Sequence, residues 1–232
     1  MKDRGSRKPN RVGTIKINNM KGIEISTEST NEIKRELIPS GTHIARCYSM
    51  IHIGNVHWEW QGEQKVSNKI RLTFELPNEM RDFGGEMKPM VISKEYTLSL
   101  HEKSNLRKDL ESWRGEAFTG SPRFDVTDML GKECMLGIMH KTGKTGNEYA
   151  TISSISKLAN GMTCPEQFNP DFIFNYHDNF NQEWLNEQPE WVQNQIKETD
   201  DYKSKMNSLK YAEHTGIPGV DNALSKVDDL PF

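Results

Sequence analysis

The stretch VISKEYTLSLHEKSNLRKDLESWRG, residues 91–115, joins a strand pattern to a helix pattern and is the most informative part of the chain about its fold. Residues 91–100 alternate between apolar and polar side chains, which predicts a strand with one buried face. Lys94 falls on the apolar parity, and this predicts that it lies at the rim of a barrel. The side chains that define the apolar parity are Ile92, Tyr96, Leu98 and Leu100.

The second half of this stretch predicts a short helix. Ser104 is a suitable N-cap, because its hydroxyl can accept a backbone N–H of the first turn, and Gly115 is a suitable stop. Leu106, Leu110 and Trp113 follow one another at i, i+4 and i+7, so they share one helix face. This spacing places Trp113 in the core rather than at a binding surface.

Strand patterns flank this unit on both sides. Residues 42–53 and 68–76 are predicted strands before it, and residues 133–140 and 148–157 are predicted strands after it, with a Gly-rich turn at 142–147. Three strands, one helix and two strands is the order of the OB-fold, a five-stranded closed barrel with a helix between strands 3 and 4. We therefore expect a mainly β protein of this fold, with a long loop between strands 1 and 2.

Composition divides the chain into four parts. Only 34% of the 232 residues are hydrophobic and the mean hydropathy is -0.77, which indicates that a substantial part stays unpacked. We expect a basic, partly disordered arm over 1–38 and the OB-fold domain over 39–160. An aromatic-rich helical extension packed on the barrel should follow over 161–199, with a disordered acidic tail over 200–232. Within the extension, Pro189 suits the first position of a helix that runs to about Glu198.

Charge is distributed unevenly along the chain. Residues 1–157 carry 25 basic and 20 acidic side chains, whereas residues 158–232 carry five and 13. A basic N-terminal part and an acidic C-terminal part are typical of a domain that binds a polyanion and is followed by a tail that binds proteins. The alternative is an uneven scatter of solvated charges.

The cysteines and the apolar runs bear on the cellular compartment. Cys47, Cys134 and Cys164 are odd in number, far apart in sequence and free of any CxxC spacing, which favours reduced thiols over disulfides or a zinc site. No apolar run approaches the length that spans a bilayer, and the N-terminus lacks the apolar segment of a secretory signal. We therefore expect a cytoplasmic protein with no membrane partner, no metal and no cofactor.

The last five residues are Asp228, Asp229, Leu230, Pro231 and Phe232. A terminal Phe combines an apolar ring with a carboxylate, so a pocket with an Arg at its lip can bind both groups. Pro231 fixes φ and lowers the entropy that is lost when the end is held extended. This tip resembles the acidic tip of bacterial single-stranded-DNA-binding proteins, which recruits replication, recombination and repair enzymes.

A wider resemblance covers residues 38–200. The block 91–115, then Leu130-Gly131-Lys132, the run from Gly143 to Ile152 and the start of a helix at 189–191 are similar to a family of phage-encoded OB-fold proteins. Members of that family are regarded as single-stranded-DNA-binding or replication-accessory proteins, which implies a location in the host cell cytoplasm. The N-terminal forty residues depart from the family.

Three groups of residues suit a single-stranded nucleic acid, which needs cations for phosphates and flat rings for bases. Trp58 and Trp60 are predicted to lie in the polar loop between strands 1 and 2, where at least one could stack on a base. Outward-facing Lys69 and Arg71 on strand 2, with Lys94 at the rim, would contact phosphates. The turn between strands 4 and 5 adds Lys141, Lys144 and Tyr149. For each residue, an ordinary solvated surface position is the alternative.

No catalytic arrangement stands out in the sequence. Gly143-Lys144-Thr145 lacks the upstream Gly of a phosphate-binding loop, because Ile138 occupies that position, and the run lies between strands. We therefore expect a protein that binds single-stranded DNA, or RNA, and recruits partner enzymes, and not an enzyme. Two alternatives are a protein-only replication adaptor, whose barrel and tip both bind proteins, and a nucleic-acid enzyme. The sequence does not determine the oligomeric state.

Overall fold

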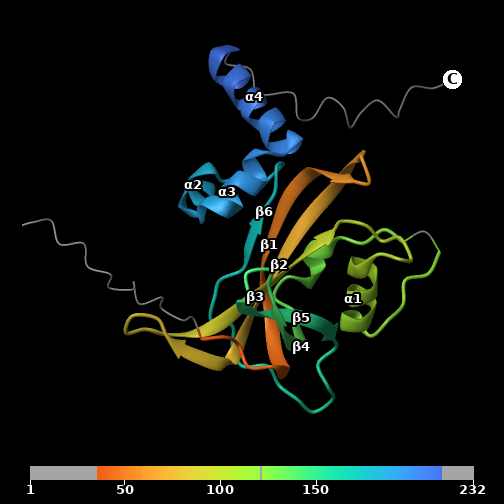
Figure 1. Cartoon of the computed structure of the whole chain (residues 1–232), viewed down its shortest axis with the longest axis vertical. Helices are drawn as coiled ribbons and strands as arrows, with labels where there is room; N and C mark the ends of the chain where they lie inside the picture. The colour runs from red at the N-terminus through yellow and green to blue at the C-terminus, as the bar shows by residue number, and fades with distance from the viewer. Residues whose placement is uncertain (1–35, 121, 216–232) are drawn as a thin grey trace, which may run out of the picture. The chain divides into compact units, whose positions relative to one another are not determined.

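Two long strands form the spine of the computed structural model, which describes residues 36–120 and 122–215. β1 (Gly41–Trp60) pairs with β2 (Glu63–Asp82) in an antiparallel hairpin whose end reaches well away from the other strands (Figure 1). Gln61 and Gly62, at its turn, have φ values of 53° and 80°. Two successive positive φ angles are typical of the type I′ turn, whose twist suits a two-residue hairpin.

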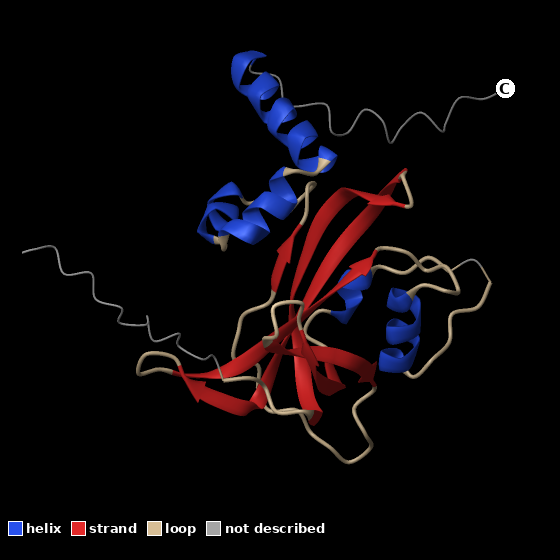
Figure 2. Ribbon diagram, viewed as in Figure 1, coloured by secondary structure: helices blue, strands red, loops and turns tan. Residues whose placement is uncertain are grey.

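The remaining strands complete a six-stranded sheet. β3 (Met87–Thr97) pairs with β2, β4 (Glu133–Thr142) pairs with β1, and β5 (Glu148–Ser156) pairs with β4, all antiparallel. The order across the sheet is β3-β2-β1-β4-β5, and β6 (Phe172–Phe174) pairs with β1 in parallel. The predicted mainly β class and the predicted turn between strands 4 and 5 are confirmed (Figure 2). The sequence had not predicted β6.

The two ends of this order, β3 and β5, are not joined by a hydrogen-bonded ladder within the described residues. The structure therefore shows a six-stranded sheet in this order, in which β3 and β5 lie close together without pairing. The predicted helix does lie between β3 and β4 in the chain. It is α1 (Asn105–Arg114), and a 3₁₀ turn, η1 (Val126–Met129), precedes β4.

α1 covers one face of the sheet as its sequence predicts. Ser104 caps its first turn by accepting the N–H of Arg107, and Gly115 ends it with a φ of 70°. Trp113 is buried, lies 5.5 Å from the Phe74 ring between centroids, and donates its indole N–H to the carbonyl of Glu133 at 2.8 Å. The predicted core role of Trp113 is confirmed.

A second core lies on the other face of the hairpin, where the C-terminal extension packs. α2 (Gln182–Glu187) and α3 (Glu190–Lys197) stand beside β6 and the adjoining part of β1 (Figure 1). Pro189 is the N-cap of α3 rather than its first residue. The fully or nearly buried members of this core are Ile51, Ile53, Phe174, Tyr176, Leu185, Val192 and Ile196.

The expectation of disorder from residue 200 onward is wrong for residues 200–215. These residues form α4 (Asp200–Thr215), whose first turn contains two acidic side chains that complement the helix dipole. The Thr199 hydroxyl accepts the N–H of Tyr202 at 3.2 Å, and Asp201 accepts the N–H of Asn55 at 2.7 Å. A local cap and a contact with β1 therefore stabilise a helix whose apolar periodicity is weak.

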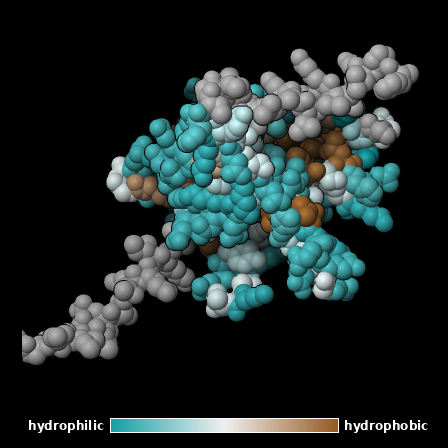
Figure 3. All heavy atoms as spheres, turned by 90° about the horizontal axis from the view of Figure 1, so that it is seen from above, coloured by the Kyte–Doolittle hydropathy of each residue, from teal (hydrophilic) through white to brown (hydrophobic). Residues whose placement is uncertain are grey.

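The parts of the chain predicted to be an arm and a tip lie largely outside the described residues. These are residues 1–35 of the arm and the tip at 228–232. The chain divides into two units between Glu36 and Leu37. Among the described residues, no helix is both long enough and apolar enough to cross a membrane. The face seen in Figure 3 is mostly hydrophilic where it is described, with hydrophobic side chains gathered in smaller areas.

Candidate functional site

One face of the β1–β2 hairpin carries two tryptophan side chains and two lysine side chains. Trp58 lies directly opposite Lys65, and Gly54 lies opposite Lys69. Directly opposed residues share a face, as do alternate residues along a strand. Trp58, Trp60, Lys65 and Lys69 therefore project from the same side of the hairpin, which we call the tryptophan face.

The predicted long loop around these tryptophans is wrong, because residues 54–67 continue both strands to the turn at Gln61 and Gly62. The Trp58 indole N–H donates to the Ser67 hydroxyl at 2.8 Å, and the Lys65 ammonium lies 5.9 Å from the Trp58 ring centroid. These contacts fix the ring on the strand. Trp58 remains 41% exposed and Trp60 remains 55% exposed, so both rings are available to a ligand.

The sequence predicts that Arg71 faces solvent, and this prediction is wrong. Arg71 lies on the same side of β2 as Lys69, but only 5% of it is exposed, because α3 covers this part of the sheet. Its guanidinium donates to Glu95 from Nε at 3.0 Å and also from Nη2. Nη2 donates further to the Gln195 amide oxygen at 2.6 Å. Arg71 is therefore a support for α3 and is not a free phosphate contact.

Trp191 is an aromatic residue of this face that the sequence analysis did not assign to the site. The Arg71 guanidinium carbon lies 4.5 Å from the centroid of its ring, and the residue is nonetheless 61% exposed. A signal was present in the sequence. Val192 and Ile196 form the buried stripe of α3, so Trp191 lies off that stripe and has no core to enter.

The tryptophan face and Trp191 form one continuous row. Lys65, Lys69 and Arg71 lie on one side of β2, with about 13 Å of strand between the first two and about 7 Å between the last two. Trp58 lies beside Lys65, and Trp191 lies over Arg71. Exposed rings thus stand at both ends of a segment that carries two lysines. Such an arrangement can stack on separate flat groups while its cations contact anions between them.

Lys69 supplies the least compensated charge in this row. It has no ion-pair partner among the described residues, whereas Lys65 lies 3.6 Å from the Glu63 carboxylate. Glu95, the acid closest to Lys69 along β3, is hydrogen-bonded to Arg71. The centre of the row therefore carries a positive charge that an anionic ligand can neutralise.

Lys94 lies on the α1 side of β3 and makes a structural contact. Its ammonium is 2.7 Å from the Asp109 carboxylate, which also accepts the Tyr96 hydroxyl at 2.8 Å. Burial, followed by the Asp109 charge, raises the pKa of Tyr96, so this hydroxyl stays protonated as a donor. Lys94 thus joins β3 to α1 and does not project into the row.

The structure brings Lys141, Lys144 and Tyr149 together but places them far from the row. Lys141 lies opposite Tyr149 at the end of the β4–β5 hairpin, and Lys144 lies in its turn. The β4 residue Ile138 pairs with Gly41, at the opposite end of β1 from Trp60. Since β1 has 20 residues, the two groups are separated by roughly 60 Å of strand.

Neither a metal site nor a family match adds to this description of the site. Within residues 36–120 and 122–215, no three His, Cys, Asp or Glu side chains are placed to hold a metal ion. Comparison of the chain with protein-family models and with curated proteins finds no match.

Proposed function

We propose that this chain is an OB-fold protein that coats single-stranded DNA during phage replication or recombination and recruits partner enzymes through its acidic C-terminal tip. The observation that carries the proposal is the row formed by Trp58, Trp60 and Trp191 with Lys65 and Lys69. It supplies exposed rings for bases and cations for phosphates on one face, which is what sequence-independent binding of a single strand requires.

The strand order supports the OB-fold part of the proposal. An OB barrel has three consecutive strands, a helix and two further strands, with strand 1 between strands 2 and 4. The order β3-β2-β1-β4-β5, with α1 between β3 and β4, is compatible with that arrangement. β3 and β5 lie close together, and hydrogen bonding between them would close the barrel. The face of strands 2 and 3 on which OB-folds bind oligonucleotides is the face that carries Lys69 and Trp191.

The row favours single strands over duplexes for a physical reason. A tryptophan ring can stack on a base only where the base face is exposed, and the bases of a duplex are stacked on one another. Stacking on a ring does not itself distinguish one base from another, because every base has a flat face. We therefore propose binding with little sequence preference, and RNA is included as a test ligand because its bases present the same faces.

Recruitment of partner enzymes is proposed from residues 228–232 alone. Phe232 unites ring and carboxylate, and Asp228 and Asp229 can pair with a basic rim around a partner's pocket. In this proposal the row supplies affinity for DNA and the tip supplies affinity for proteins. The two activities should therefore be separable by mutation.

The test is an equilibrium titration of labelled oligo-dT, a mixed-sequence single strand, RNA and a duplex, each at several salt concentrations. We expect both DNA single strands to bind alike and the duplex to bind weakly. The logarithm of the association constant should fall with the logarithm of salt concentration by about 0.7 for each neutralised phosphate. Failure of every single strand to bind at low salt would favour the protein-only adaptor. Cleavage or other turnover of the oligonucleotide would favour an enzyme.

A further inference from the structure

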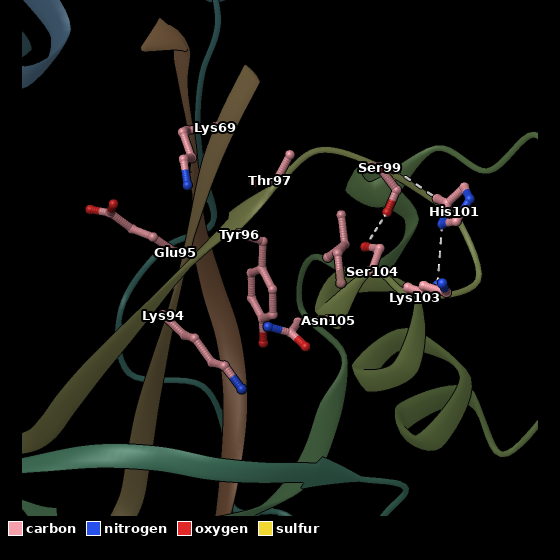
Figure 4. A pocket seen from close by; sticks show the side chains of 11 residues that line it. Lys69, Lys94, Glu95, Tyr96, Thr97, Ser99, His101, Lys103, Ser104 and Asn105 are labelled. Carbon is pink, nitrogen blue, oxygen red and sulfur yellow. Dashed lines mark hydrogen bonds between the residues drawn. The ribbon is translucent and has the colours of Figure 1, made fainter. Parts of the chain in front are cut away.

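A cavity of about 430 Å³ opens between the end of β3 and the start of α1, next to the row of tryptophans. Lys69 and Glu95 stand on its strand side, and His101, Lys103 and Asn105 stand on the side of the segment that leads into α1 (Figure 4). The volume is within the range of small-ligand sites, about 300–1,000 Å³. A ligand of that size would share Lys69 with a strand bound along the row.

Two of the charged groups that line the cavity are already neutralised by residues outside it. The Lys94 ammonium lies 2.7 Å from the Asp109 carboxylate. The Glu95 carboxylate accepts hydrogen bonds from the buried guanidinium of Arg71. In Figure 4 the Glu95 carboxylate also points away from the side chains of the α1 segment. Neither group therefore sets the charge of the cavity.

The two remaining lysines, Lys69 and Lys103, set that charge. Neither has an ion-pair partner within the described part of the chain, so the cavity has an excess of two positive charges. A phosphate monoester carries about −1.5 to −2 charges at pH 7, whereas each internal phosphodiester of a strand carries one. The excess charge of the cavity matches the monoester.

Neutral groups complete the lining of the cavity. The Asn105 side chain can donate from its amide, and Ser99 accepts the backbone N–H of His101 at 3.2 Å, which leaves its hydroxyl proton as a donor. Tyr96 and Leu106, both almost fully buried, also line the cavity, so a sugar attached to the phosphate would lie over apolar side chains there. These groups suit a phosphate that is attached to a nucleoside.

We propose that this cavity binds a phosphate monoester, supplied by the phosphorylated end of a strand that lies along the row. The inference rests on the proposed function for the source of the ligand, because Lys69 belongs to both the row and the cavity. The ligand chemistry itself, a nucleoside phosphate monoester, is also that of a free mononucleotide. The experiment therefore separates these two sources.

The experiment titrates the full chain with internally labelled oligo-dT that ends in hydroxyls, in a 5′-phosphate or in a 3′-phosphate. We expect one phosphorylated form to bind about five- to ten-fold more tightly than the hydroxyl form, because its end adds charge-assisted hydrogen bonds. Calorimetric titration with 5′- and 3′-thymidine monophosphate measures whether the free nucleotide is a ligand in its own right.

Two matched variants localise the effect. Lys103→Ala should abolish the preference for a phosphorylated end and leave affinity for the hydroxyl form within about two-fold, because Lys103 does not lie in the row. Lys103→Gln should do the same while keeping a polar side chain that is only one atom shorter. Lys108→Ala, which removes an exposed lysine of α1 that does not line the cavity, should keep the preference.

Each outcome supports or overturns the phosphate site in the cavity, the proposed binding of strands, or both. Equal affinity for all three ends, with no nucleotide binding, would overturn the cavity proposal and leave strand binding intact. A preference that persists in Lys103→Ala would also overturn it. Binding of mononucleotide that depends on Lys103, without any binding of strands, would support the phosphate site and overturn the proposed function. Absence of both kinds of binding would overturn both.

Discussion

The guanidinium of Arg71 lies against the ring of Trp191, with 4.5 Å between its central carbon and the ring centroid. Arg71 belongs to the middle of β2 and Trp191 to the first turn of α3, so this contact joins the sheet to the C-terminal extension. The same guanidinium is held by Glu95 and Gln195. The sequence predicts that Arg71 contacts DNA, whereas in the structure its guanidinium packs against the exposed ring of Trp191.

Replacing Arg71 should therefore affect stability, whereas replacing Lys69 should affect DNA binding. Arg71→Ala leaves Gln195 and Glu95 without their shared donor and should lower the free energy of unfolding by about 2 kcal/mol in urea denaturation. Lys69→Ala should leave stability nearly unchanged and make the salt dependence of DNA binding shallower. If Arg71→Ala kept full stability and matched Lys69→Ala in salt dependence, Arg71 would be a phosphate contact after all.

The two tryptophans of the hairpin should contribute directly to DNA affinity. Trp58→Ala with Trp60→Ala should cost about 1–3 kcal/mol of binding free energy for each ring that stacks on a base, and should reduce the quenching of fluorescence by oligo-dT. Phe83→Ala is the matched control, because Phe83 at the β2–β3 turn is as exposed as Trp60, at 55%. Unchanged affinity in a folded double variant would remove the hairpin from the site.

Glu75 should be essential for the segment that follows β5. Its carboxylate is fully buried and accepts the N–H of Phe168 at 2.9 Å, the N–H of Asn169 at 2.8 Å and the Asn169 side-chain amide at 2.7 Å. Glu75→Gln replaces one acceptor with a donor that faces an N–H group, so the free energy of unfolding should fall by about 1–3 kcal/mol. Glu116→Gln, at an exposed carboxylate, is the control. Equal urea midpoints for the two variants would contradict this role.

The tip should act through its terminal ring and carboxylate together. Adding one residue after Phe232 moves the carboxylate away from the ring and keeps both acidic residues, so partner binding in a pull-down with host repair enzymes should be lost while DNA affinity is retained. Deletion of residues 228–232 should have the same effect on partner binding. Survival of partner binding in the extended chain would mean that the tail acts through acidic charge alone.

Local signals account for the parts of the fold that the sequence predicts well. α1 has its N-cap at Ser104, its stop at Gly115 and its buried face within a dozen residues, so no distant contact is needed to define it. The strands are predicted where one face enters the core, as at Phe74 and Leu76, because alternation is then visible.

Distant contacts account for what the sequence did not predict. The outer half of the β1–β2 hairpin has no buried face, so apolar alternation is absent there, although Trp58 and Trp60 do alternate with His57 and Glu59. The burial of Arg71 depends on α3, which lies far along the chain and covers only one part of β2. Strand propensity and apolar periodicity do not indicate which residues of β2 a helix from far along the chain will cover.

Ultraviolet crosslinking of the full chain to oligo-dT, followed by mass spectrometry of the crosslinked peptides, tests whether DNA binds along the row of Trp58, Trp60 and Trp191. We expect adducts in the peptides that contain Trp58 and Trp60 and in the peptide that contains Trp191, with excess unlabelled oligo-dT competing for all of them. Adducts confined to residues 1–35, or to the β4–β5 turn around Lys144, would contradict the assignment of the DNA site to this face.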